Sequence, residues 1–218
     1  MMEPPRAKEN SGDKETGRLE SFSDGVFSIA MTLLVLELSV PKLNGAVKPR
    51  ALLWALMVQW PSYLAFVTSF FTVLIMWVNH HGIFRLVRRT DSTLLFANGF
   101  LLLLVTVVPF PTALVATYLR TPAAGVVCAV YSGTFVLISI SYSLLLSAAR
   151  RGGGHLTVAN AGPEISRRLR DSWLIGTPLY LIGAVVAPIA PSVTLCICTG
   201  LWVFWSVGRG GTGAGFAR

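Results

Sequence analysis

Residues 94–119 read LLFANGFLLLLVTVVPFPTALVATYL and contain no charged side chain. Residues 122–149 are also free of charge, and the stretch Phe22–Val40 carries only Asp24 and Glu37. A helix needs about 20 mostly apolar residues to cross roughly 30 Å of hydrocarbon, and each of these stretches is long enough. The sequence therefore predicts an all-α integral membrane protein.

The composition agrees with a membrane protein. Only 13% of the residues are charged, against about 25% in a typical soluble domain. The net charge of +8 comes from basic residues between the apolar stretches, so it favours a role in membrane topology over nucleic-acid binding. The three cysteines, Cys128, Cys196 and Cys198, lie within apolar stretches and lack metal-site spacing. We expect them to be packing residues, and we expect no metal or cofactor.

We expect six membrane-spanning helices and a polar tail at each end. The helices are expected at about 19–40, within 51–87, and at about 93–118, 123–149, 171–189 and 192–207. Pro61 is expected either to kink the second helix or to separate a short outer helix from it. The expected organisation is a disordered cytoplasmic tail over 1–17, a transmembrane domain over 18–208 and a flexible tail over 209–218.

The positions of the basic residues predict that both ends lie in the cytoplasm. With that orientation, the only basic residues outside, among 18 in the chain, are Lys42, Lys48, Arg50 and Arg120. Because cytoplasmic loops carry an excess of Lys and Arg, this distribution supports both the orientation and the count of six helices.

Polar residues of the first three predicted helices fall at a similar depth. An acid such as Asp24 costs about 2.5–3.5 kcal/mol near the bilayer centre, so it is expected to have partners. The second helix returns to the cytoplasmic side with His80 and His81, and the third carries Asn98 near its start. We therefore expect a polar network, which either only fixes the helices or also serves gating or proton sensing. Its members are Arg18, Ser23, Asp24, His80, His81 and Asn98.

The first helix also carries an apolar stripe, Ile29, Leu33 and Leu36, beside a row of small residues. In isolation this stripe is typical of any membrane helix. The chain has no potassium filter of the Thr-Val-Gly-Tyr-Gly type, no Arg-rich voltage sensor, and no G-x-S-x-G or H-E-x-x-H motif. We therefore do not expect an enzyme.

Three blocks of sequence are more specific. Residues 18–24 read RLESFSD, which fits R-x-x-x-F-S-D, and GVFSIAMTLLVLEL follows at 25–38. The second block has Trp60-Pro61 and then WVNHH at 77–81, and the third has Asn98 and PFPT at 109–112. Over about residues 18–115 the chain resembles the prokaryotic members of the transmembrane protein 175 family, the lysosomal potassium channel family.

The resemblance implies a potassium-permeable homotetramer, embedded in lipid, in which the first helix of each subunit lines the pore. Ile29 would form the narrowest hydrophobic ring, with Leu33 and Leu36 stacked outward and Thr32 adding a hydroxyl ring. A prokaryotic plasma membrane is the implied location.

The resemblance also implies how the pore helix is held. Trp77 and His81 of the second helix would pair with the motif of the first helix, and the i, i+4 relation to Trp77 favours His81 over His80. The implied network is Arg18, Phe22, Ser23, Asp24, Trp77, His81 and Asn98.

Two other functions stay open at this point. A proton-coupled carrier would use Asp24 and His81 as its proton site. A non-conducting membrane sensor or scaffold would use the polar layer only as structure.

Overall fold

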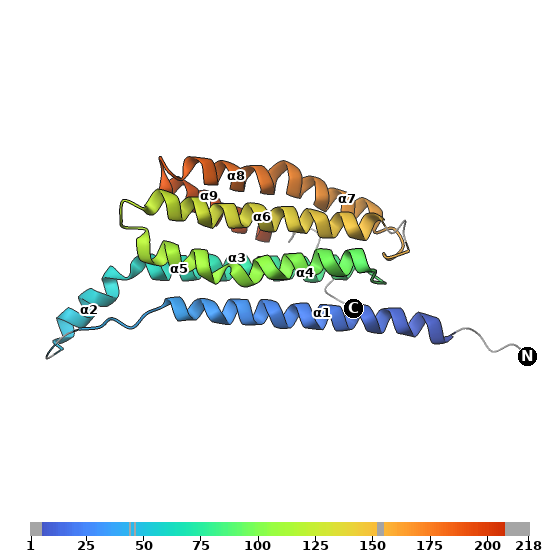
Figure 1. Cartoon of the computed structure of the whole chain (residues 1–218), viewed down its shortest axis with the longest axis horizontal. Coiled ribbons are helices and arrows are strands. Elements are labelled where there is room, and N and C mark those ends of the chain that lie inside the picture. The colour runs from blue at the N-terminus through green and yellow to red at the C-terminus, as the bar shows by residue number, and fades with distance from the viewer. Residues whose placement is uncertain (1–5, 44, 46, 152–154, 208–218) are drawn as a thin grey trace, which may run out of the picture.

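The computed structural model describes residues 6–43, 45, 47–151 and 155–207, and in this part of the chain it contains helices and no strand. One isolated antiparallel bridge joins Val87 and Thr157. The helices, shown in Figure 1, are α1 (Arg6–Leu33), α2 (Pro49–Val58), α3 (Trp60–Phe84), α4 (Ser92–Val107), α5 (Pro109–Tyr118), α6 (Ala124–Arg151), α7 (Gly162–Asp171), α8 (Thr177–Val186) and α9 (Pro191–Val207).

Proline residues mark several helix starts, because proline fits the first turn but removes a hydrogen-bond donor from a helix interior. The expected helix over 93–118 is divided at Val108 into α4 and α5, and α5 begins at Pro109. The expected outer helix before Pro61 is present as α2, separated from α3 at Gln59. Asp91 caps α4 by accepting a hydrogen bond of 2.8 Å from the backbone amide of Leu94.

Four helical segments in the described residues are long and apolar enough to cross a membrane. They are Glu15–Glu37, Trp60–Phe84, Ser92–Tyr118 and Ala124–Arg151. The expected fifth helix, 171–189, begins at the last residue of α7 and continues through a π-helical turn (Ser172–Gly176) into α8, which ends at Val186. The expected sixth helix is the shorter apolar helix α9.

The first helix begins earlier than the sequence analysis places it. Residues 6–17, assigned there to a disordered tail, are the start of α1, and a turn of 3₁₀ helix (Leu34–Glu37) continues the helix at its other end. Residues 6–17 include Ala, Lys and Glu, which favour helix. Residues 1–5 and the expected C-terminal tail, 209–218, lie outside the described residues.

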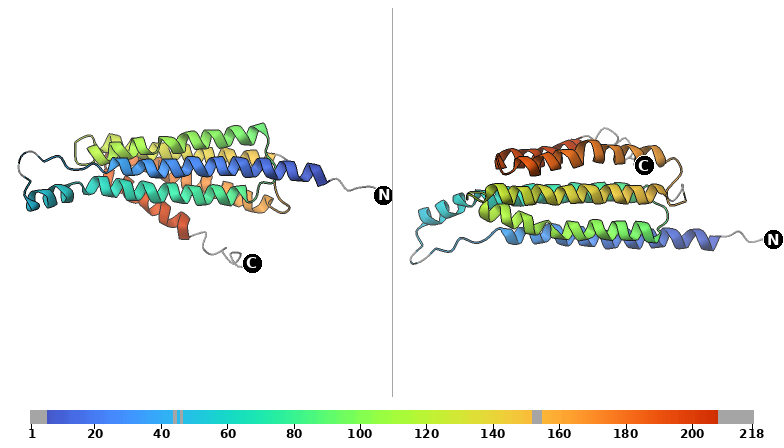
Figure 2. Two further views of the ribbon diagram at one scale, coloured as in Figure 1. Left: turned by 90° about the horizontal axis from the view of Figure 1, so that it is seen from below. Right: turned by 45° about the horizontal axis from the view of Figure 1, so that its top comes forward.

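The helices are arranged around α6. In Figure 1, α1 runs along one edge of the bundle, α7 and α8 run along the opposite edge, and α6 lies between them. The right-hand view of Figure 2 shows the same order, and the left-hand view shows α1 in front, between the green α4–α5 and the teal α3. The largest fully buried side chains of α6 are Tyr131, Phe135, Ile138 and Leu145. The amphipathic α7 lies at the end of the bundle where α1 begins, whereas α2 projects from the other end. From α1, the core receives one buried face, which includes Phe27 and Ala30.

Candidate ion pathway and its polar layer

The helix α1 has one face against the bundle and one face away from it. The buried face carries Ser23, Phe27, Ala30 and Leu34, which recur every three or four residues and pack against α3 and α4. Only 22% of the span in α1 is buried, against 44% of the span in α6. The helix is therefore attached along a single stripe, and the rest of its surface is available for contacts outside the chain.

The predicted pore residues lie on the exposed face. Ile29 is 58% exposed and Leu36 is 71% exposed, and Leu33 lies between them on the same stripe. The Thr32 hydroxyl, also exposed, donates a hydrogen bond of 2.9 Å to the backbone carbonyl of Ile29. An apolar stripe that faces away from its own bundle can face lipid or the same stripe of other copies.

On the opposite side of α1, a buried chain of hydrogen bonds joins three helices. The Asn98 side chain on α4 donates to the Ser23 hydroxyl of α1 at 2.9 Å. The oxygen of the same amide lies 2.8 Å from Nε2 of His80 on α3, and in this pair the imidazole is the donor. The Ser23 hydroxyl in turn donates a hydrogen bond of 2.8 Å to the backbone carbonyl of Leu19. All three side chains are buried, so these bonds pair most of their polar atoms, whereas Nδ1 of His80 has no hydrogen-bond partner among the described residues.

The contacts between α1 and α3 continue with two further pairs. The Trp77 indole N–H donates to Oδ1 of Asp24 at 2.8 Å. Nδ1 of His81 lies 2.8 Å from Oε1 of Glu20, and the ring of His81 stacks on that of Trp77 with centroids 6.0 Å apart. Glu20 and Asp24 are one helical turn apart, as are His81 and Trp77. Because α1 and α3 run in opposite directions, the earlier residue of α1 pairs with the later residue of α3, and the two contacts lie one helical turn apart.

The structure brings together Ser23, Asp24, Trp77 and Asn98 from the predicted network, and it places His81 beside them. Arg18 and Phe22 are instead exposed, on the side of α1 that carries Ile29. Both histidines take part, in different places: His80 is buried against Phe27 and Phe84, whereas His81 pairs with Glu20.

Sequence reasoning missed the role of Glu20. The signal was present, because Glu20 lies one turn before Asp24 on the face that meets α3. The preference for His81 over His80 came from spacing along α3 alone, which does not reveal that α4 supplies a partner for the adjacent residue.

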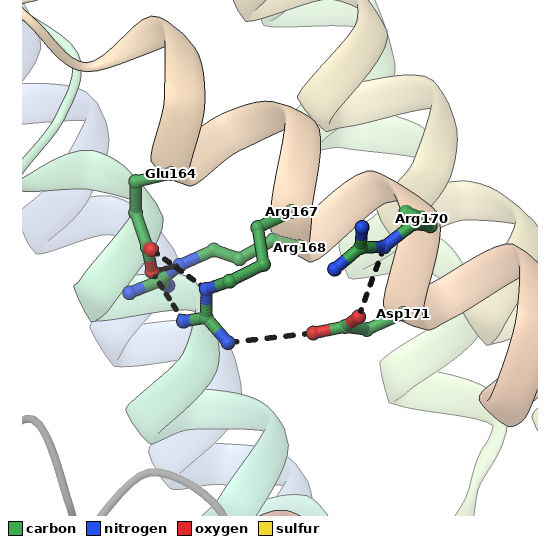
Figure 3. Close-up of polar contacts among 5 residues, drawn as sticks. All are labelled: Glu164, Arg167, Arg168, Arg170 and Asp171. Carbon is green, nitrogen blue, oxygen red and sulfur yellow. Dashed lines mark hydrogen bonds and ion pairs between the residues drawn. The ribbon is translucent and has the colours of Figure 1, made fainter.

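A second polar group lies outside the spans, on α7. Glu164 accepts hydrogen bonds from Nε and Nη2 of Arg167, at 3.0 and 2.9 Å, and from Nε of Arg168 at 2.6 Å (Figure 3). Partial burial acts to raise the pKa of Glu164, but these hydrogen bonds, first from Arg167 and then from Arg168, lower the pKa below its ordinary value. The carboxylate therefore stays charged and serves two guanidinium groups at once.

The described residues contain no group of three or more His, Cys, Asp or Glu side chains that could hold a metal ion. In the same part of the chain, Cys128 and Cys198 are buried and Cys196 is exposed, and all three are free thiols.

Comparisons with known proteins identify the family. A family model described as endosomal/lysosomal potassium channel TMEM175 matches residues 18–109. A potassium channel of Chamaesiphon minutus is 44% identical over 207 residues, which cover 95% of this chain and 98% of that protein. The chain belongs to the TMEM175 family.

Further similar proteins support the assignment to the TMEM175 family. A potassium channel of Streptomyces collinus is 42% identical over 83% of this chain and 86% of its own length. The human endosomal/lysosomal proton channel TMEM175 is 35% identical over 48% of this chain and 22% of its own length. The crystal structure of a lysosomal potassium-selective TMEM175 homologue from Chamaesiphon minutus matches with a TM-score of 0.78 at 43% identity, covering 89% of this chain and 98% of that one.

Membership of the TMEM175 family and the four apolar helices together make the chain an integral, multi-pass membrane protein. The family match includes all the residues of the α1 stripe and of the polar layer, since both lie within 18–109.

Proposed function

We propose that this protein is a potassium-permeable channel of a bacterial plasma membrane, assembled from four copies. The observation that carries the proposal is the two-sided character of α1. One side is held to α3 and α4 by the polar layer, and the other presents Ile29, Leu33 and Leu36 away from the bundle. Relatives that share almost the whole length are named potassium channels.

In the proposed assembly, the α1 helices of four copies surround a central pore. Four copies related by rotation place the same stripe at the axis, whereas one stripe on one chain encloses nothing. Gly25 and Ser28 are small and lie on the exposed side of α1, so neighbouring helices can approach closely. The same proposal has six spans per copy, with the π-helical turn and α8 forming the fifth and α9 the sixth, and both ends in the cytoplasm.

The proposed constriction is a ring of Ile29 side chains, with Leu33 and Leu36 stacked outward and the Thr32 hydroxyls beside them. An apolar ring offers no oxygen atoms to replace the water around an ion, so the barrier depends on partial dehydration. Potassium loses water more readily than sodium, and the ring therefore favours potassium. Wet and dry states of the same ring can also open and close the pore.

Within this proposal the polar layer is structural. The network proposed to hold the pore helix consists of Ser23, Asp24, Trp77, His81 and Asn98, joined by Glu20 and His80. Arg18 and Phe22, expected in the same network, lie on the exposed side of α1 with Ile29. The tight pairing of α1 to α3 and α4 fixes the rotation of α1 about its axis, and that rotation decides which residues face the pore.

Proton movement is the second candidate function, because the human relative is named a proton channel and carboxyl and imidazole groups meet at Glu20 and His81. A carrier that uses Asp24 and His81 would need protons to reach the bundle side of α1. A channel conducts along the other side.

The test is the reversal potential of the purified protein in a planar bilayer, with potassium on one side and sodium on the other. The channel proposal predicts a shift toward the potassium equilibrium potential. A flux that saturates and follows an imposed proton gradient, with no potassium-dependent shift, would favour the carrier instead.

A further inference from the structure

A cavity lies in the half of the bundle that does not involve α1. Its volume is about 80 Å³, and it is bounded by α3, α6, α7, the π-helical turn, α8 and α9. Most of the wall is apolar or aromatic, with Met76, Phe135, Ile138, Tyr180 and Trp205 among the lining residues. One buried water occupies about 10–15 Å³ on this measure, so the space exceeds what a single bridging water fills.

Two buried polar atoms at this cavity have no hydrogen-bond partner among the described residues. They are Nη1 of Arg168, which can only donate, and Oδ1 of Asn79, which accepts. An unpaired buried polar atom costs about 1–3 kcal/mol. A donor and an acceptor left unpaired at one cavity indicate a ligand that presents both an acceptor and a donor.

The position of Arg168 is built into the fold. Its Nε atom is anchored by Glu164, which also binds Arg167 (Figure 3). Gly82 on α3 makes room for the guanidinium, since a Cβ atom there would lie 3.0 Å from Nη1 of Arg168. Arg167 also reaches Asp171, which in turn lies 3.8 Å from Arg170. The three arginines of this group therefore share two carboxylates, Glu164 and Asp171, which leaves one net positive charge beside the cavity.

The wall opposite α3 departs from regular helix. Residues Ser172–Gly176 form a π-helical turn, and such turns often occur at functional sites. The Ser139 hydroxyl lies 3.2 Å from that of Ser172 and 2.8 Å from that of Thr177. A Cβ atom at Gly176 would lie only 3.2 Å from Oγ of Ser139. The π-helical turn and the absence of a side chain at Gly176 therefore both shape this wall of the cavity.

We propose that this cavity binds an anionic lipid whose headgroup combines a phosphate with free hydroxyl groups. The phosphate accepts from Arg168, a headgroup hydroxyl donates to Asn79, and an acyl chain enters the apolar part of the cavity. A phosphatidylcholine headgroup has no net charge and no donor, so it satisfies at most Arg168. Soluble glycerol phosphate carries the same polar groups without the chains.

The experiment measures the melting temperature of the purified full-length protein in a neutral detergent. Phosphatidylglycerol, phosphatidylcholine and soluble glycerol phosphate are titrated separately. We expect phosphatidylglycerol to raise the melting temperature at concentrations where the other two have no effect. Equal effects of the two lipids would overturn the proposal, and a response to glycerol phosphate alone would overturn the assignment to a lipid.

Two pairs of variants locate the effect. Arg168→Gln is expected to weaken phosphatidylglycerol binding at least about tenfold, or ~1.4 kcal/mol, whereas Arg170→Gln is expected to have no effect, because Arg170 is exposed on the same helix. Equal losses in both variants would show surface charge rather than a site.

The second pair leaves the charge unchanged. Ile75→Phe adds volume at a residue that lines the cavity, whereas Leu74→Phe adds the same kind of side chain at a neighbour that does not line it. Ile75→Phe is expected to lose the response to phosphatidylglycerol and Leu74→Phe to keep it. A full response in Ile75→Phe would contradict occupation of the cavity, even if Arg168→Gln does not fold.

Discussion

The helices α1 and α6 have the same length, 28 residues, but they relate to the rest of the chain in opposite ways. α6 is surrounded by other helices, and its aromatic side chains form the core. α1 lies at an edge, is half as buried along its span, and is held by polar contacts on one side. The comparison indicates that α6 forms the centre of the fold, whereas the exposed face of α1 is available for contacts with other molecules.

The largest expected effect is on stability and belongs to α6. Phe135→Ala should lower the free energy of unfolding by about 3 kcal/mol, because a fully buried aromatic side chain leaves a cavity. Ile29→Ala, on the exposed stripe, should change it by less than about 1 kcal/mol in the single chain. Denaturation followed in detergent measures both. Equal losses would remove the distinction between the two helices.

The next effect separates the two adjacent histidines. His80→Ala should cost about 2 kcal/mol, because it leaves the buried side-chain oxygen of Asn98 without a hydrogen-bond donor. His81→Ala should cost less than about 1 kcal/mol, since its pair with Glu20 is partly exposed to the surroundings. Melting of the purified protein compares the two variants. A larger loss in His81→Ala would contradict the arrangement of the polar layer.

The third prediction concerns conduction. Ile29→Asn should raise the potassium current at least about tenfold, equivalent to a barrier lowered by ~1.4 kcal/mol, and should reduce selectivity over sodium, because a polar ring stays wet. Bilayer recordings measure both. The matched control is Leu137→Asn, at a half-exposed position of α6, which should leave the current unchanged. An equal rise in the control would place the effect outside the α1 stripe.

The smallest effect is the coupling between α1 and α3. A double-mutant cycle of Asp24→Asn and Trp77→Phe should give an interaction energy of about 0.6 kcal/mol, the average for hydrogen bonds between membrane helices. Asp24→Asn keeps the size of its side chain, whereas Trp77→Phe removes the indole N–H together with part of the ring that stacks on His81, and the cycle separates that packing loss from the pairwise interaction. An interaction energy of zero would mean that this contact does not fix the rotation of α1.

Much of the fold could be predicted from the sequence, because charge-free stretches and prolines act locally. The apolar run 94–119 and Pro109 together predicted a long helical segment with a proline in its later half, and α4–α5 is such a segment. The π-helical turn at Ser172–Gly176 was not predicted, since it depends on packing of Ser172 against Ser139 on α6.

The contacts of the candidate site could be predicted where the spacing of residues along a single helix determines which side chains share a face. Asp24 and Trp77 were both identified, and they are hydrogen-bonded. Spacing could not decide that Asn98 meets His80, because the contact depends on how α4 is rotated against α3. Arg18 and Phe22 belong to the same sequence motif as Asp24, but on the helix they lie on the exposed side. A motif written as a linear sequence does not show on which side of a helix each of its residues lies.

The most direct test of the central claim, that the exposed face of α1 lines the ion path, is thiol accessibility under current recording. Cysteines are introduced one at a time at Ile29, Leu33 and Leu36, and at the buried Ala30 as the control, in a Cys196→Ser background because Cys196 is the exposed native thiol among the described residues. A charged, water-soluble thiol reagent should alter the potassium current at the first three positions and leave the Ala30 variant unchanged. Unaltered current at all three positions, with labelling verified by mass, would contradict the account.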